Sequence, residues 1–102
     1  MKVMLVCTAG MSTSLVMKKI ETYAKEQAID LTMKAYPLQE FHEYVQEFDM
    51  ILLGPQISYK REEIQESLQQ PVAVINGLDY ALGNAKNIIL MMNRLKEKGE
   101  NL

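Results

Sequence analysis

The chain has 102 residues, 48% of them hydrophobic and 24% charged, which is typical of a soluble protein with one domain. A formal net charge of -2 gives no general attraction to nucleic acid or anionic lipid. No apolar run approaches the roughly 20 residues of a membrane span, so we expect no nucleic-acid partner and no direct membrane insertion.

The content of cysteine and histidine restricts the chemistry further. One cysteine excludes an internal disulfide and favours a reducing cytoplasm. One cysteine and one histidine are too few for a structural zinc site, which usually takes four cysteine or histidine ligands. We therefore expect a cytoplasmic protein with no metal.

The first half of the chain predicts two strands and two helices. The apolar residues of Lys2–Val6 are consecutive, which indicates a strand buried on both faces. A helix is predicted from about Ser12 to Gln27 by the spacing of its apolar residues. Leu31–Tyr36 alternates, as a strand nearer a sheet edge would. The apolar spacing after Pro37 predicts a short amphipathic helix ending near Glu47.

The second half repeats this alternation. Met50–Leu53 is a second fully buried strand, and Tyr59–Gln69 is charged and helical. Val72–Ile75 is the fourth strand. A loop is predicted from Asn76 to Gly83, and a last helix from Asn84 to Lys98.

Alternating strands and helices favour an α/β fold with a single four-stranded parallel sheet and helices on both faces, in one domain over residues 1–102. Sites in such sheets lie outside the carboxyl ends of the strands. This rule brings the loops over residues 7–14, 54–59 and 76–83 to one edge of the sheet.

Cys7 stands where the first strand ends and the first helix begins. The N–H groups of a helix start have no partners within the helix, and they attract anions and favour a thiolate. Gly10 permits backbone conformations that let several N–H groups converge on one anion. The alternative for Cys7 is that a lone cysteine is more often a small buried hydrophobic residue. The alternative for Ser12, Thr13 and Ser14 is helix capping, but a cap needs only one hydroxyl and these residues supply three. The combination favours a nucleophilic cysteine in a phosphate-sized loop.

Known phosphate-binding loops offer comparisons. A nucleotide-binding Walker A loop needs a lysine, and this loop has none. The loop of protein tyrosine phosphatases also starts with a cysteine at a strand end, and the predicted fold is similar to that of the low-molecular-weight tyrosine phosphatases. Those enzymes carry an arginine six positions after the cysteine, where this chain has Thr13. Because that arginine stabilises charge during hydrolysis, its absence indicates a loop that holds a phosphoryl group for a specific acceptor.

Three segments resemble the enzyme IIB components of the bacterial sugar phosphotransferase system, in the lactose/cellobiose family. They are Cys-Thr-Ala-Gly-Met-Ser-Thr-Ser at 7–14, Leu-Gly-Pro-Gln-Ile-Ser-Tyr at 53–59, and Val-Ile-Asn at 74–76 followed by Tyr80. The resemblance covers essentially the whole chain. Without a fused transporter, the chain looks more like the cellobiose, chitobiose and β-glucoside members than the lactose ones. One departure is Ala81, where many relatives have glycine after the tyrosine.

The resemblance implies a protein-Nπ-phosphohistidine–sugar phosphotransferase that works through phosphocysteine. A phosphohistidine on a cytoplasmic IIA protein passes its phosphoryl group to Cys7. Cys7 then transfers it to a sugar, a β-linked disaccharide such as cellobiose, held by the membrane IIC transporter. No cofactor is implied. The residues implied to hold the phosphoryl oxygens are Thr8, Ala9, Gly10, Met11, Ser12, Thr13 and Ser14.

Three further residues are candidates for contacts at the rim of the site or with a partner. Gln56 and Tyr59 have this interpretation, although a structured turn after Pro55 explains them equally well. Tyr80 is interpreted as a lid or a hydrogen-bond donor. His42 is interpreted as an exposed polar residue and not as a phosphoryl carrier.

Two other functions stay open on the residues alone. A small cysteine-dependent phosphatase or arsenate-reductase-like enzyme would lack its arginine at Thr13 and a second cysteine to resolve an oxidised intermediate. A non-catalytic phosphate-binding module would have an inert cysteine. Alkylation of Cys7 separates the binding module from the enzymes, and hydrolysis of an aryl phosphate identifies a phosphatase.

Overall fold

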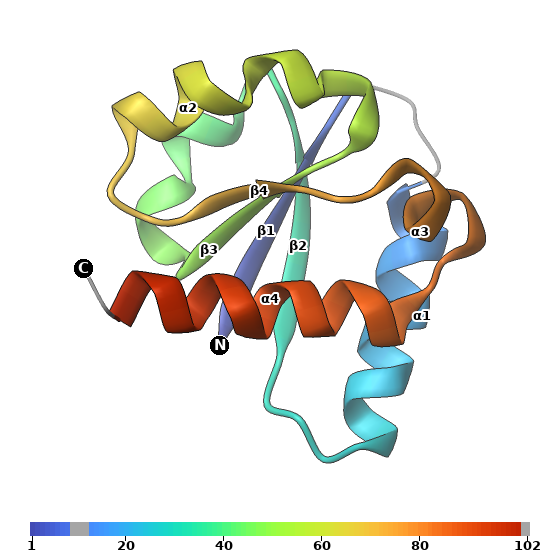
Figure 1. Ribbon diagram of the computed structural model, residues 1–102. Helices are drawn as coiled ribbons and strands as arrows, with labels where there is room; N and C mark the ends of the chain where they lie inside the picture. Colours follow the sequence, from blue (N-terminus) through green and yellow to red (C-terminus); the bar gives the residue numbers. More distant parts are fainter. Residues whose placement is uncertain (9–12, 101–102) are drawn as a thin grey trace.

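A computed structural model describes residues 1–8 and 13–100, the last three of them without their side chains. Its four strands form one parallel sheet (Figure 1) in the order β2-β1-β3-β4. The strands are β1 (Lys2–Cys7), β2 (Thr32–Pro37), β3 (Met50–Leu53) and β4 (Val72–Val74). All four predicted strands are confirmed within a residue or two, including the place of the alternating strand β2 at an edge of the sheet.

The strand register sets where the functional loops meet. Cys7 pairs with Pro37 of β2, Val6 pairs with Leu53 of β3, and Leu53 in turn pairs with Val74 of β4. The carboxyl ends of the four strands therefore lie along one edge of the sheet, as the alternation of elements predicts.

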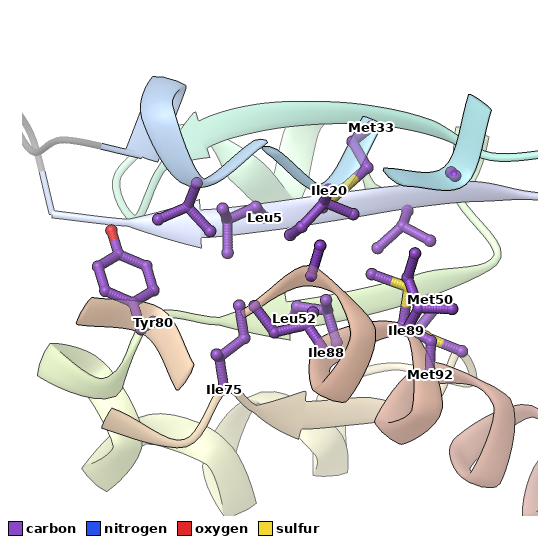
Figure 2. Packing of buried hydrophobic residues seen from close by; sticks show 14 residues of the cluster. Leu5, Ile20, Met33, Met50, Leu52, Ile75, Tyr80, Ile88, Ile89 and Met92 are labelled. Carbon is purple, nitrogen blue, oxygen red and sulfur yellow. The ribbon is translucent and has the colours of Figure 1, made fainter. Parts of the chain in front are cut away.

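Two long helices cover one face of the sheet. They are α1 (Thr13–Glu26) and α4 (Ala85–Glu100), close to their predicted bounds. Figure 2 shows how their apolar side chains pack against those of β1 and β3. None of the described helices is both long enough and apolar enough to cross a membrane. The residues of this cluster, the first core cluster, include Val3, Leu5, Val16, Ile20, Met50, Leu52, Ile75, Tyr80, Ile88, Ile89 and Met92.

The opposite face is covered by short elements: η1 (Phe41–Glu43), η2 (Val45–Glu47), η3 (Pro55–Lys60) and α2 (Arg61–Ser67). The expected amphipathic helix ending near Glu47 is thus two single 3₁₀ turns, which still bury the apolar positions that suggested it. The helix predicted over 59–69 is shorter, because Leu68 is already extended. The second core cluster on this face includes Met4, Val6, Phe41, Val45, Phe48, Ile51, Leu53, Ile57, Ile64 and Val72.

The predicted loop over residues 76–83 is wrong, because it contains the helix α3 (Gly77–Leu82). The side-chain oxygen of Asn76 accepts hydrogen bonds from the backbone N–H groups of Leu78 (2.9 Å) and Asp79 (3.2 Å). At the other end, Gly83 adopts the left-handed conformation that closes a helix, with φ of 62°. Capping at both ends thus stabilises a helix too short to show a hydrophobic period.

Candidate active site

Cys7 is the last residue of β1, and its side chain is only 8% exposed. Its backbone carbonyl accepts a hydrogen bond from the N–H of Leu38 at 2.9 Å, which ties the strand end to the segment after β2. The sulfur lies 3.7 Å from the hydroxyl oxygen of Thr13 and 3.9 Å from the carbonyl oxygen of Tyr36. The thiol is therefore held by its strand at the carboxyl edge of the sheet, beside the first residue of α1.

Thr13 begins α1, and its side chain is 7% exposed. Its hydroxyl is close enough to the sulfur of Cys7 for either group to be the donor. With a thiolate, the hydroxyl can only donate, so a negative charge on the sulfur would orient it. The position where a tyrosine phosphatase carries a cationic arginine thus holds a neutral donor aimed at the cysteine.

Tyr80 reaches the same edge from α3. Its side chain is 7% exposed, and its hydroxyl is buried without a hydrogen-bond partner among the residues that the structure describes. Figure 2 shows that hydroxyl at the end of the first core cluster, turned toward β1. Burial raises the pKa of the Tyr80 phenol above its ordinary value, and negative charge on Cys7 raises it further. The phenol therefore keeps its proton near neutral pH, and its O–H donor near the cysteine has no partner within residues 1–8 and 13–100.

Gly54, which follows β3, leaves room between the start of η3 and the side chain of Tyr80. Its N–H donates to the carbonyl of Val6 at 3.0 Å, so the chain after β3 runs directly beside the end of β1. A Cβ at this position would lie 2.8 Å from the side-chain oxygen of Gln56 and 3.8 Å from the ring of Tyr80. Gln56 and Tyr80 thus border the same small space.

The structure brings most of the predicted residues to this edge. Thr8 is half-buried, and Ser14 is exposed on the first turn of α1. Tyr59 is 75% exposed and points away from the core. The remaining predicted loop residues, 9–12, lie outside the described part of the chain. His42 is exposed, as expected, with its ring beside that of Phe41 at 4.0 Å between centroids.

One positioning contact has no counterpart among the sequence predictions. The ammonium of Lys19 on α1 donates to the carbonyl of Leu82 at 3.3 Å, and its alkyl chain covers Gly83. This contact joins the helix of Thr13 to the helix of Tyr80. The sequence signal that would have revealed α3 is the pair of Asn76 and Gly83. Asparagine is a typical helix cap, and the glycine seven positions later is typical of a helix end.

The fold and the site define a small α/β protein that places one buried cysteine, with two hydroxyl groups near it, at the carboxyl edge of a parallel sheet. The family described as "PTS system, Lactose/Cellobiose specific IIB subunit" matches residues 2–97. The chain belongs to this family, and it is a IIB component of a sugar phosphotransferase system.

Relatives agree with this assignment. The oligo-beta-mannoside-specific EIIB component of Bacillus subtilis (strain 168) is 31% identical over 101 residues, covering 91% of this chain and 98% of that protein. The cellobiose-specific EIIB component of Lactococcus lactis subsp. lactis (strain IL1403) is 26% identical, covering 89% of this chain and 92% of that protein. The galactose-specific EIIB component of Lactococcus lactis subsp. cremoris (strain MG1363) is 27% identical with the same two coverages.

Solved structures agree as well. The cellobiose-specific phosphotransferase IIB component from Borrelia burgdorferi is 34% identical, with a TM-score of 0.73, and covers 99% of this chain and 92% of its own. The lactose-specific IIB domain from Streptococcus pneumoniae has a TM-score of 0.79 at 16% identity, covering 91% of this chain and 95% of its own, and so supports the fold alone. IIB components are phosphotransferase subunits of systems that phosphorylate sugars, and they work with IIA and IIC partners.

Proposed function

We propose that Cys7 carries the phosphoryl group in a relay from a phosphohistidine of a IIA protein to a sugar held by a membrane IIC transporter. The observation that supports this most strongly is the position of Cys7, the chain's only cysteine, at the carboxyl end of β1 in a IIB component. A nucleophile at this edge can meet a partner because the loops of three strands open there.

Each step of the relay is an in-line displacement at phosphorus. In the first, the Cys7 thiolate forms a sulfur–phosphorus bond while the phosphorus–nitrogen bond breaks, and the electron pair returns to the imidazole. In the second, a sugar hydroxyl oxygen bonds to phosphorus, the sulfur–phosphorus bond breaks, and the thiolate leaves. The hydroxyl proton of the sugar is taken up by a base or by solvent. Positioning and charge stabilisation provide the catalysis.

The residues around Cys7 divide this work. Residues 8–14 hold the phosphoryl oxygens, and within them the Thr13 hydroxyl donates to the sulfur that it already approaches at 3.7 Å. Tyr80 supplies a further O–H donor, since its buried hydroxyl has no partner in the described chain. Gln56 lies at the rim beside Tyr80, and Tyr59 is exposed enough to contact a partner.

The sugar is a β-linked disaccharide such as cellobiose. Support comes from the names of two relatives, which are specific for oligo-beta-mannosides and for cellobiose. The name of the galactose-specific relative is the counterexample. Residues 1–102 act as one cytoplasmic IIB domain, without a cofactor and without nucleic acid.

The test is the intact mass of the chain after incubation with phosphoenolpyruvate, the general phosphotransferase proteins and a matching IIA protein. We expect a gain of one phosphoryl group, about 80 Da, on the thiolate nucleophile. Cys7→Ser should show no gain. A native chain that gains no mass and hydrolyses an aryl phosphate would contradict the relay and support a phosphatase.

A further inference from the structure

A cavity of about 230 Å³ opens on the face of the sheet opposite α1 and α4, between η1 and α2, and is here named the η1–α2 cavity. Figure 1 shows α2 close to the green segment that holds η1. The sulfur of Cys7 faces the other side of the sheet, where it lies beside Thr13 of α1. The cavity is therefore separate from the candidate active site.

The floor of the η1–α2 cavity is apolar. Leu38, Phe41 and Ile64 form it, and all three pack in the second core cluster. Phe41 is 1% exposed and Ile64 is 4% exposed, so the core holds these side chains in place and they do not fill the space above them. The N–H of Leu38 also donates to the carbonyl of Cys7 at 2.9 Å. The floor is thus a preformed apolar surface, which is typical of small-molecule sites.

The rim of the η1–α2 cavity is polar, and its two charges balance. The ammonium of Lys60 lies 3.5 Å from a carboxylate oxygen of Glu63. An ion pair this exposed contributes little to stability, so both groups stay able to bond with a ligand. The hydroxyl of Ser67 donates to the carbonyl of Ile64 at 2.9 Å, which leaves the lone pairs of its oxygen as acceptors. The exposed imidazole of His42 adds a fourth polar group.

Size and chemistry together indicate the class of ligand. Sites for drug-sized molecules begin at about 300 Å³, so this cavity suits a smaller molecule, such as a single sugar ring. A pyranose has C–H groups that match the apolar floor, and adjacent hydroxyls that can accept from an ammonium and donate to a carboxylate at the same time. Because the charges of Lys60 and Glu63 cancel, an uncharged ring is favoured over a phosphorylated one.

We propose that the η1–α2 cavity binds one uncharged pyranose ring of a sugar. This binding is independent of the relay, because the ligand lies across the sheet from the sulfur of Cys7 and forms no bond with it. IIB components serve systems that phosphorylate sugars, so sugar is present both before and after phosphorylation. The balanced rim of the cavity selects the sugar over the sugar phosphate.

The test is a titration of the nitrogen-15-labelled chain with methyl β-glucoside, followed by its amide signals in NMR spectra. We expect shifts confined to the surroundings of His42, Lys60 and Ser67 that saturate with a Kd of about 1–10 mM, because the site is small and makes few contacts. Glucose 6-phosphate should bind about fivefold more weakly or less. Glycerol, which has hydroxyls but no ring, should cause no such shifts at the same concentrations. Cys7→Ser should bind the glycoside as the native chain does.

Glu63→Ala and Glu62→Ala form a matched pair of variants on α2. Both carboxylates are exposed, but only Glu63 lines the cavity. Glu63→Ala should weaken binding of the glycoside by about fivefold or more, because an acceptor for its hydroxyls is lost. Since Lys60 then lacks its carboxylate, the same variant should bind glucose 6-phosphate about fivefold more tightly than the native chain does. Glu62→Ala should change either affinity by less than about twofold.

Three results would overturn the proposal. One is the absence of localised shifts at the highest glycoside concentration, or their reproduction by glycerol. Another is an equal loss of affinity in Glu62→Ala and Glu63→Ala. The third is tighter binding of glucose 6-phosphate than of the glycoside by the native chain, which would make the cavity a site for the product. A chain that binds the glycoside but accepts no phosphoryl group would instead contradict the relay and leave this site in place.

Discussion

Tyr80 combines a buried hydroxyl that has no partner in the described chain with a position near Cys7, the only cysteine. An unsatisfied buried hydroxyl costs about 1–3 kcal/mol of stability. That cost is offset if the hydroxyl finds its partner when a phosphoryl group is bound at Cys7. In the proposed relay, Tyr80 would thus contribute to transfer in one state at the expense of stability in the other.

Tyr80→Phe should therefore separate stability from transfer. Removing this hydroxyl, which has no partner among the described residues, is expected to raise the free energy of unfolding of the unphosphorylated chain by about 0.5–1 kcal/mol in urea titrations. The same change should lower the rate of phosphoryl transfer by about tenfold or more, because a donor to the phosphoryl oxygens is lost. Tyr44→Phe, at a side chain that is 37% exposed and whose ring stacks against that of Tyr36, is the control and should change neither. Unaltered transfer in Tyr80→Phe would contradict the assigned donor.

The raised pKa of Tyr80 adds a dependence on pH. The folded chain holds the phenolic proton more tightly than the unfolded chain does. The corresponding stability is present below the ordinary tyrosine pKa, about 10, and is lost as pH rises toward the folded value. Tyr80→Phe lacks this contribution. Its advantage over the native chain in urea titrations should consequently stay constant well below about pH 10 and grow as pH rises from about 10 toward the folded value.

At the scale of elements, the sequence predicted the most deeply buried strands and helices correctly. The strands β1 and β3 are buried along almost their whole length, so a run of apolar residues was a sufficient signal. The order of elements also correctly placed Cys7, Gly54 and Tyr80 at one edge. The segment before Phe48 has correct apolar spacing, yet it forms 3₁₀ turns, because burying Phe41 and Val45 does not require a continuous helix.

The helix α3 was missed because its stability comes from its ends and not from a hydrophobic period. Its two leucines are exposed and Tyr80 is its only buried residue, whereas a surface helix usually buries its apolar residues on one face. The contact of Tyr80 with the region of Cys7 could be inferred only from the shared edge of the sheet. The burial of its hydroxyl away from any partner in the described chain, in contrast, depends on packing that no local pattern encodes.

Gly83→Ala should destabilise α3 and with it the site. A Cβ at Gly83 would collide with the Lys19 side chain, and φ of 62° is unfavourable for any residue with a side chain. We expect a loss of about 1–2 kcal/mol in the free energy of unfolding. Phosphorylation should slow as well, because Tyr80 lies in the same helix.

Gly77→Ala is the matched control at the other end of α3. The nearest atom to an added Cβ there is the Cβ of Pro55 at 4.0 Å, which is ordinary van der Waals contact. Alanine favours a helix more than glycine does, so this variant should be neutral or stabilise by up to about 1 kcal/mol. Equal losses in the two variants would show that the left-handed conformation of Gly83 contributes nothing special.

Over the whole molecule, the two core clusters are joined through the strands themselves. Val3 and Leu5 of β1 face the first core cluster, and Met4 and Val6 face the second. Successive side chains of a strand point to opposite faces, so neither cluster can come apart without releasing β1. Cys7 follows immediately, and the position of its sulfur therefore depends on both clusters at once.

This arrangement should make unfolding a single cooperative transition. Ile88→Ala in the first core cluster and Ile64→Ala in the second remove side chains that are 1% and 4% exposed. Each should lower the free energy of unfolding by about 2–4 kcal/mol. Leu90→Ala, at a side chain 43% exposed on the same helix as Ile88, should cost less than about 1 kcal/mol.

Calorimetry and urea titration followed by circular dichroism should show one transition that moves as a whole in both isoleucine variants. Alkylation of Cys7 as urea increases should follow that same transition, because the burial of its sulfur depends on β1. Two separate transitions, with Cys7 exposed in only one of them, would show that one face of the sheet can hold Cys7 in place alone. A single transition would instead mean that every large loss of stability in either cluster also weakens the proposed phosphoryl-transfer site.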